Sequence, residues 1–193
     1  MGNRFTLVRL AVATLPLLAA AAAVRADEPL DGDLEIRSAY AVPSHGVIML
    51  SARVSYPRNE LLSATLRDGV TLSFDLECVV SRHRRFWLDA EAVSLVRHTE
   101  LSYQVVADRY LLRNVDTAAQ ESFATLEAAL AHIGTVDEWP IAVDSQLAND
   151  EQWQISLRAG VRRGHMPDAL RALMFWSDAW HRTSEWYTWT LVR

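Results

Sequence analysis

The sequence predicts a mainly β (α+β) fold: an antiparallel β-sandwich or a strongly curved antiparallel sheet of about eight or nine strands, with two to three short inserted helices. Several segments alternate apolar and polar residues with a period of two, which is typical of strands with one buried face. Turn-forming residues separate these segments, and the helical patterns between them are short. A Greek-key sandwich is our first choice, and a single sheet wrapped on a helix is the second.

The first elements are expected to be a β-hairpin and a short helix. Residues 34–42 and 50–56 carry the period-two pattern, and residues 43–46, Pro-Ser-His-Gly, have the chemistry of a turn. Asn59 is then expected to cap a helix that ends at Asp68 and Gly69.

The clearest strand spans residues 70–80. One of its faces is entirely apolar, with Val70, Leu72, Phe74, Leu76, Cys78 and Val80. Further strands are expected at residues 92–97, 101–107 and 109–115. They lead to a second helix, capped by Ser122 and stopped by a left-handed residue at Gly134.

The C-terminal part of the chain is expected to hold two strands and a third helix. Residues 153–161 alternate as a half-buried strand, and residues 164–167 form a turn. The helix begins at Asp168 and runs to about residue 181, and residues 185–192 close the chain as a strand.

The N-terminus has the pattern of a secretory signal peptide over residues 1–26. Arg4 and Arg9 precede an uncharged apolar run over residues 10–24, which is shorter than the roughly 20 residues that span a membrane. Residues 27–33 are interpreted as a flexible lead and residues 34–193 as a single β-rich domain. We expect a periplasmic protein with no stable membrane anchor after cleavage. The alternative is an uncleaved anchor in the inner membrane that faces the periplasm.

Charge and cysteine content narrow the classes of partner. The chain has 19 Arg, no Lys and 24 acidic residues, a net charge of -5, and removal of residues 1–26 takes three Arg and leaves -8. An acidic chain of this kind disfavours a nucleic-acid partner. Cys78 is the only cysteine and lies on an apolar strand face, so we expect a buried hydrophobic side chain rather than a disulfide.

No residue spacing typical of a catalytic, metal or cofactor site occurs. No two of the six His stand three or four apart on one expected helix, and phosphate-loop, dinucleotide and nucleophile-elbow motifs are missing. We therefore expect no cofactor, no metal and no enzymatic activity. A hydrolase with a non-local triad is the alternative, and it requires a histidine within hydrogen-bond reach of both a serine and a carboxylate.

The most unusual run of residues follows the clearest strand and supplies our candidate partner or ligand contacts: Arg82, His83, Arg84, Arg85, Trp87 and Asp89. Guanidinium groups beside aromatic rings bind carboxylates or phosphates. A secondary basic patch, Arg158, Arg162 and Arg163, is expected to join the first if the strands pair. The structural alternative for the first cluster is that its arginines pair with the chain's own Asp75, Glu77 or Asp89.

Tryptophan is concentrated near the C-terminus, at positions 176, 180, 186 and 189. The spacing of the first two favours a helix that packs its Trp face onto the sheet. A stacking platform for sugars or peptides is the alternative.

The order and spacing of several motifs resemble a family of secreted proteobacterial proteins catalogued as domain of unknown function 4390. The motifs are Asp68-Gly69-Val70-x-Leu72-x-Phe74, Arg82-x-Arg84-Arg85-x-Trp87-x-Asp89, Leu101-Ser102-Tyr103, Arg109-Tyr110, Phe123-x-x-Leu126-x-x-Ala129-Leu130, Trp139-Pro140, Met166-Pro167, Trp176, Trp180, Ser184, Trp186 and Trp189. The family usually has Leu-Pro at Met166-Pro167, a volume-conserving difference. The resemblance covers nearly all of the chain after residue 26.

The resemblance implies an exported protein without an assigned activity, often encoded beside a nitrogen-regulation-type sensor kinase and its response regulator. It brings no catalytic residues. We therefore expect a non-enzymatic interaction or accessory module, with the periplasmic region of a sensor kinase as a candidate partner. The alternative is a carrier or sensor of a small amphipathic or anionic ligand, held between the two sheets or under the Trp-bearing helix.

Overall fold

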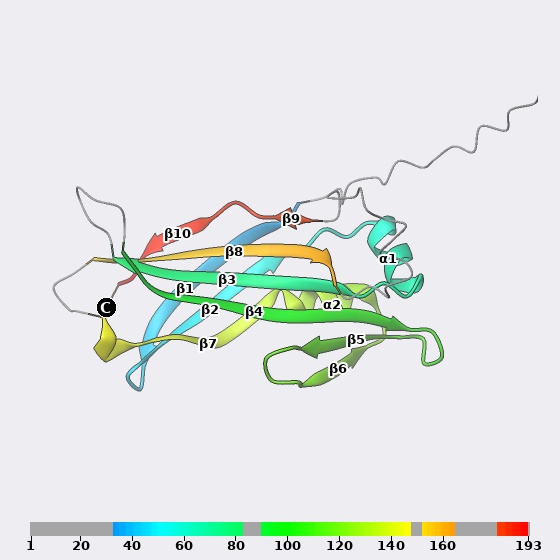
Figure 1. Cartoon of the computed structure of the whole chain (residues 1–193), viewed down its shortest axis with the longest axis horizontal. Coiled ribbons are helices and arrows are strands. Elements are labelled where there is room, and N and C mark those ends of the chain that lie inside the picture. The colour runs from blue at the N-terminus through cyan, green and yellow to red at the C-terminus, as the bar shows by residue number, and fades with distance from the viewer. Residues whose placement is uncertain (1–32, 83–89, 148–151, 165–180, 193) are drawn as a thin grey trace, which may run out of the picture.

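The computed structural model describes residues 33–82, 90–147, 152–164 and 181–192, which form two antiparallel sheets around a hydrophobic core (Figure 1). The mainly β fold predicted from the sequence is confirmed. The strands are β1 Glu35–Ser44, β2 Val47–Ser55, β3 Leu72–Arg82, β4 Ala90–Gln104, β5 Arg109–Asn114, β6 Gln120–Phe123, β7 Thr135–Val143, β8 Trp153–Arg163, β9 Arg182–Thr183 and β10 Tyr187–Thr190. The helices are α1 Glu60–Arg67 and α2 Leu126–Ile133, with a 3-10 turn, η1 Asp144–Gln146.

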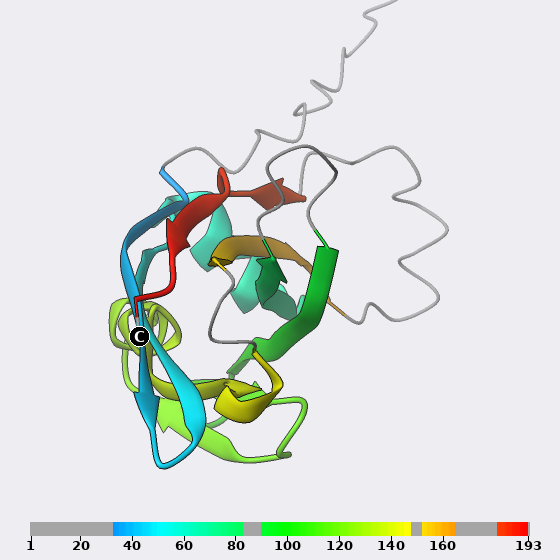
Figure 2. The same ribbon diagram turned by 90° about the vertical axis from the view of Figure 1, so that its left-hand side faces the viewer.

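The two sheets pack against each other through their apolar faces. The smaller sheet has the order β1-β2-β7, and the larger has the order β10-β8-β3-β4-β5-β6, with β9 also paired to β8. In the end-on view of Figure 2, β1 and β2 lie on one side of the molecule and β3, β4 and β8 on the other. β1 and β10 are therefore edge strands of different sheets, and both figures place them on the same side of the molecule.

The first hairpin is confirmed, with a shorter turn than expected. β1 and β2 pair from Glu35 opposite Ser55 to Ser44 opposite Val47. His45 and Gly46 form the turn with φ of 51° and 79°, the positive values that a tight two-residue hairpin needs. Pro43 belongs to β1 rather than to the turn. An edge strand tolerates proline because the missing N–H then faces away from the ladder.

The two described helices follow their expected positions, but the second begins later than predicted. In α1, Oδ1 of Asn59 accepts a hydrogen bond from the Leu62 N–H at 2.8 Å, as expected of the cap. Ser122 does not cap α2, because it lies in β6 and pairs with Leu111 of β5. Thr125 caps α2 instead, and its hydroxyl accepts from the Ala128 N–H at 3.2 Å.

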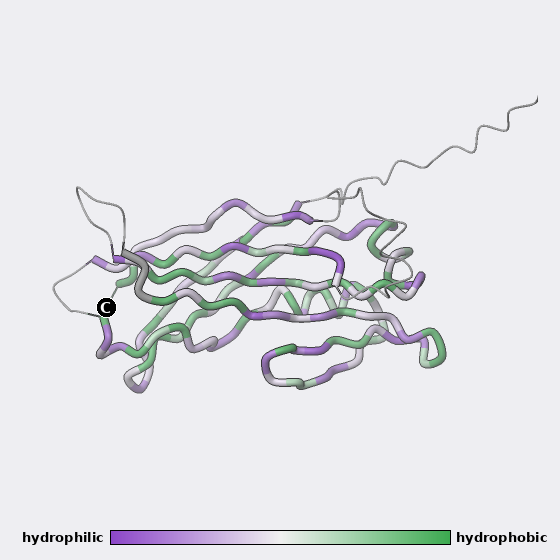
Figure 3. The backbone as a smooth tube through the Cα atoms, in the orientation of Figure 1, coloured by the Kyte–Doolittle hydropathy of each residue, from purple (hydrophilic) through white to green (hydrophobic). Residues whose placement is uncertain are grey.

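β3 lies inside the larger sheet and begins at Leu72 rather than at the predicted Val70, and from Leu72 on its apolar face is as predicted. Leu72, Phe74, Leu76, Cys78 and Val80 are at most 4% exposed. Hydrophobic and hydrophilic positions alternate along the strands of this sheet in Figure 3. Burial raises the pKa of the Cys78 thiol to about 12, so the thiol stays protonated and packs as a hydrophobic side chain.

Several strand boundaries differ from the predictions. The strands expected at residues 92–97 and 101–107 are one strand, β4, because its ladder with β3 continues through His98, Thr99 and Glu100. β6 and β7 were not predicted. β7 contains Pro140 and pairs with β2 through two register shifts, so it lacks the regular alternation that marks a strand. Its edge position accommodates both irregularities.

Several predicted features lie outside the described residues, among them the signal peptide of residues 1–26, residues 27–32 of the lead and residues 165–167 of the expected turn. So do most of the third helix, over residues 168–180, and the segment 83–89 that carries most of the candidate contacts. Among the described residues, no helix is long and apolar enough to cross a membrane.

Candidate functional site

The first predicted contact cluster is described only at Arg82, which ends β3 and is half-buried. His83, Arg84, Arg85, Trp87 and Asp89 lie outside the described residues, so their role as partner or ligand contacts stays a prediction.

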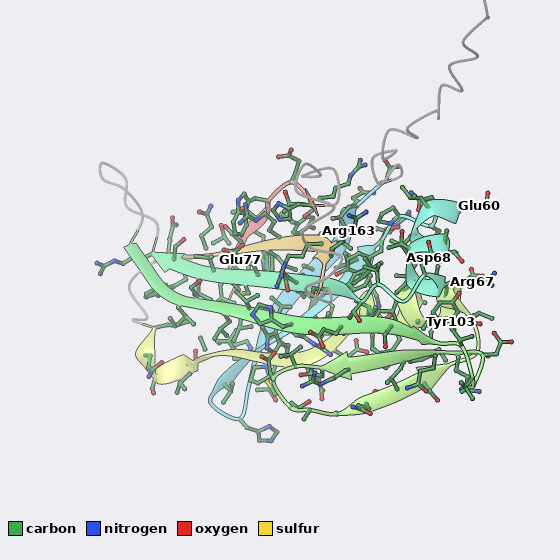
Figure 4. All side chains as sticks on the ribbon, turned by 45° about the vertical axis from the view of Figure 1, so that its right-hand side comes forward. Glu60, Arg67, Asp68, Glu77, Tyr103 and Arg163 are labelled. Carbon is green, nitrogen blue, oxygen red and sulfur yellow. The ribbon has the colours of Figure 1, made fainter. Side chains whose placement is uncertain are left out.

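The secondary basic patch lies on β8, and it does not join Arg82. β3 and β8 pair as the prediction required, but the register places Arg82 opposite Trp153 and Arg163 opposite Leu72. The ladder between these two pairs spans about 30 Å at the usual rise of a strand. Figure 4 shows Arg163 at the end of β8 nearest to α1, with Glu77 further along β3. The prediction of one larger patch that includes Arg82 is therefore wrong.

Arg158 forms an internal ion pair. Its Nη2 lies 2.7 Å and its Nε 3.2 Å from Oε2 of Glu77, the residue opposite it on β3. The ring of Trp186 lies over the guanidinium, 4.4 Å from Cζ to the ring centroid. Both contacts use groups of this chain, so Arg158 is held as part of the sheet surface.

Arg162 is paired in the same way, through Asp75. Nε of Arg162 lies 2.7 Å from Oδ2 of Asp75, and Nδ1 of His98 lies 2.8 Å from Oδ1. Burial alone would raise the pKa of the Asp75 carboxyl, but the hydrogen bonds from Arg162 and His98 outweigh it and lower the pKa below its ordinary 3.8. The outer face of the larger sheet therefore carries cations neutralised by its own carboxylates at these positions.

We expect Asp75 to make the stability of the protein acid-sensitive. A carboxyl whose pKa is lowered by folding stabilises the protein above its ordinary pKa of 3.8, and this contribution is lost as the pH falls through the lower folded value. Asp75→Asn should be less stable than the parent at neutral pH and should lose less stability on acidification below about pH 4. Urea denaturation at a series of pH values measures both effects. If the free energy of unfolding falls equally steeply with pH in the two proteins, Asp75 is not the group responsible for the acid sensitivity.

We expect Arg158→Ala to lower the free energy of unfolding by about 1 kcal/mol, because it removes a half-exposed ion pair and the stacking on Trp186. Arg158→Lys keeps the charge but not the planar stacking, so its free energy of unfolding should lie between those of the parent and the alanine variant. Equilibrium denaturation gives the three values. An alanine variant as stable as the parent would favour a ligand-contact role for Arg158.

A catalytic triad needs one histidine that contacts both a serine and a carboxylate. In the described part of the chain, these contacts are made by different histidines. His98 contacts the carboxylate of Asp75, whereas Nδ1 of His45 lies 3.1 Å from the hydroxyl of Ser44. Nε2 of His132 lies 3.4 Å from Glu121. Of the residues described, no histidine contacts both a serine and a carboxylate, and no group of three or more His, Cys, Asp or Glu could hold a metal ion.

A second feature lies where the edges of the two sheets meet, and we call it the seam. It is a hollow of about 410 Å³, lined by residues 34–37, at the start of β1, and by Ser184, Glu185, Trp186 and Tyr187. Trp186 is 41% and Tyr187 37% exposed, although aromatic side chains of this size are usually well buried. The seam therefore combines an apolar surface with the edge of β1.

Ser184 positions the aromatic wall of the seam. Its N–H donates to the Ala159 carbonyl at 2.8 Å, and its buried hydroxyl accepts from the Ala159 N–H at 3.0 Å. The same hydroxyl donates to the Glu185 carbonyl at 2.8 Å. These hydrogen bonds attach the segment between β9 and β10 to β8. The backbone that leads into Trp186 and Tyr187 is therefore held in place.

Trp186 and Trp189 belong to the tryptophan-rich region of the sequence, but the seam itself was not predicted. Its two walls are about 150 residues apart in the chain and belong to different sheets. Trp176 and Trp180 lie outside the described residues, so the packed Trp helix and the stacking platform both stay predictions.

The comparisons with known proteins identify a family without a described activity. No curated protein and no solved structure matches the chain. A family model described as domain of unknown function (DUF4390) matches residues 31–190, which confirms the resemblance noted from the motifs. Since the match covers most of the chain, this protein belongs to the DUF4390 family.

Proposed function

We propose that this chain is an exported, non-enzymatic module of the cell envelope that binds a partner protein in the seam. The signal-peptide pattern of residues 1–26 supports export. The observation that carries the proposal is the exposure of Trp186 and Tyr187 beside a hollow at the edge of β1. Aromatic residues next to a pocket are the side chains that most often dominate binding energy at protein interfaces.

The candidate partner is the periplasmic region of a sensor kinase. This choice is supported by the resemblance to a family often encoded beside such a kinase. The seam adds a place for contact beside the ion-paired arginines of the larger sheet. Arg158 and Arg162 already bind Glu77 and Asp75, and the ring of Trp186 lies over the Arg158 guanidinium.

Photocrosslinking in intact cells tests the proposal. The photoreactive residue p-benzoylphenylalanine replaces Tyr187 in the full chain, and crosslinked proteins are identified by mass spectrometry. We expect one dominant envelope protein. The matched control places the same residue at Val106, which is fully exposed in the turn between β4 and β5, where we expect no dominant product. The absence of a product specific to position 187 would contradict the proposal.

A second candidate function is the binding of a small amphipathic molecule in the same seam. The hollow of about 410 Å³ falls within the usual range of small-molecule sites, and Arg37 at its rim carries a positive charge for an anionic head group. Native mass spectrometry of the purified protein should then show an added mass that Tyr187→Ala loses and Val106→Ala keeps. A bare protein mass together with a protein crosslink from position 187 would favour the first function.

A further inference from the structure

We infer that the partner enters the seam as an extended strand that pairs with the edge of β1, an inference that rests on the proposed use of the seam. β1 is the outermost strand of its sheet, and no other described strand pairs with it on the side away from β2. In an antiparallel ladder, every second residue of an edge strand directs its N–H and C=O away from its neighbour. Residues 35–37 of this edge line the hollow.

The geometry of β1 limits the added ladder to a short segment. A register shift between Ile36 and Ser38 bends the strand beside the hollow. Pro43, near the other end of β1, has no N–H to donate. Both features interrupt a regular ladder, so we expect an added strand of about four to six residues.

Alternate side chains of the added strand are expected to be apolar. Tyr187 pairs with Leu157 and Trp189 with Ile155, and both partners are fully buried, so the two rings lie on the core side of their sheet. The ring centroids are 5.6 Å apart. A strand on β1 directs every second side chain toward this aromatic surface.

The remaining side chains of the added strand are expected to be basic. Glu35 and Glu185 line the hollow and are exposed. Arg37 also lines the hollow, where its Nη2 donates to the Ser55 hydroxyl at 3.3 Å, so two carboxylates stand against one guanidinium. The chain as a whole is acidic, which adds a long-range attraction for a basic segment. The seam therefore fits a short segment that alternates apolar residues with Lys or Arg.

A peptide selection tests this inference with the purified full-length protein. Random displayed peptides of about nine residues are selected for binding, and those that also bind Tyr187→Ala are removed. We expect the remaining peptides to alternate apolar and basic residues with a period of two. A peptide from this set, methylated on every second backbone nitrogen, should bind about tenfold or more weakly, because methylation removes the donors of the ladder. Val106→Ala is the matched control and should bind like the parent.

Four results would overturn strand addition: helical spacing in the enriched peptides, an acidic consensus, no enrichment after subtraction, or binding that is insensitive to N-methylation. Thermal unfolding of Tyr187→Ala, compared with the more conservative Tyr187→Phe, shows whether the variant is folded before its binding is interpreted. The proposed function fails by a different result, the lack of a crosslink from position 187. A crosslink combined with N-methyl-insensitive binding would retain the seam as a partner site and reject the strand.

Discussion

Replacing Phe74 with alanine is expected to lower the free energy of unfolding by about 4 kcal/mol. Phe74 is 1% exposed and lies in β3, the strand that both β4 and β8 flank. Its ring meets the buried Tyr56 edge to face, with 5.0 Å between centroids. Alanine would remove this contact and leave a cavity between the two sheets, where neighbouring strands cannot easily close.

Urea denaturation followed by tryptophan fluorescence measures the Phe74→Ala loss. Phe74→Leu fills more of the volume and should cost clearly less than the alanine variant. Val106→Ala, at a fully exposed position, should change stability by less than about 0.5 kcal/mol. A loss below about 1 kcal/mol for Phe74→Ala would show that the core between the sheets is not packed as described.

Gly134→Ala is expected to lower the free energy of unfolding by about 3 kcal/mol because of a steric clash. Gly134 has φ of -74°, so the expected left-handed residue at the end of α2 is wrong and alanine would suit this backbone. The added Cβ, however, would lie 2.2 Å from the Val54 carbonyl oxygen. The Gly134 carbonyl also accepts a hydrogen bond from the Val54 N–H at 2.8 Å, so this end of α2 is held against β2.

Gly160→Ala is the matched control for this prediction. Its added Cβ would have no neighbouring heavy atom closer than 3.7 Å, which is ordinary contact. We expect that variant to unfold close to the parent in the same urea titration. Similar losses at both glycines would mean that β2 and α2 are not in close contact.

Segments governed by local chemistry were predictable from the sequence. β3 has an uninterrupted apolar face, α1 has an Asn cap and a glycine stop, and the first hairpin has glycine where a positive φ is needed. Each of these signals lies within about ten residues of the element that it specifies.

Elements that depend on distant pairing were not predictable. β6 forms because residues 120–123 pair with β5, and this pairing moves the cap of α2 from Ser122 to Thr125. β7 forms because it pairs with β2, although Pro140 interrupts its pattern. The register of β3 and β8 likewise decided that Arg158 and Arg162 meet carboxylates.

For the candidate site, the sequence predicts which types of residue matter but not how they are arranged. Clustered arginines and C-terminal tryptophans stand out in the sequence. In the structure, Arg158 and Arg162 of β8 are ion-paired, and Trp186 stacks on Arg158 and stays exposed. The seam needs residues from both ends of the domain, and local spacing contains no information about that contact.

Amide hydrogen exchange of the complex shows whether a partner strand pairs with β1 in the seam. The protein is compared alone and with the partner captured from position 187 or a selected peptide. Pairing with β1 predicts slower exchange over β1, with β7, the opposite edge of the same sheet, unchanged. Protection of β7 alone, or unchanged exchange over β1 in a saturated complex, would contradict it.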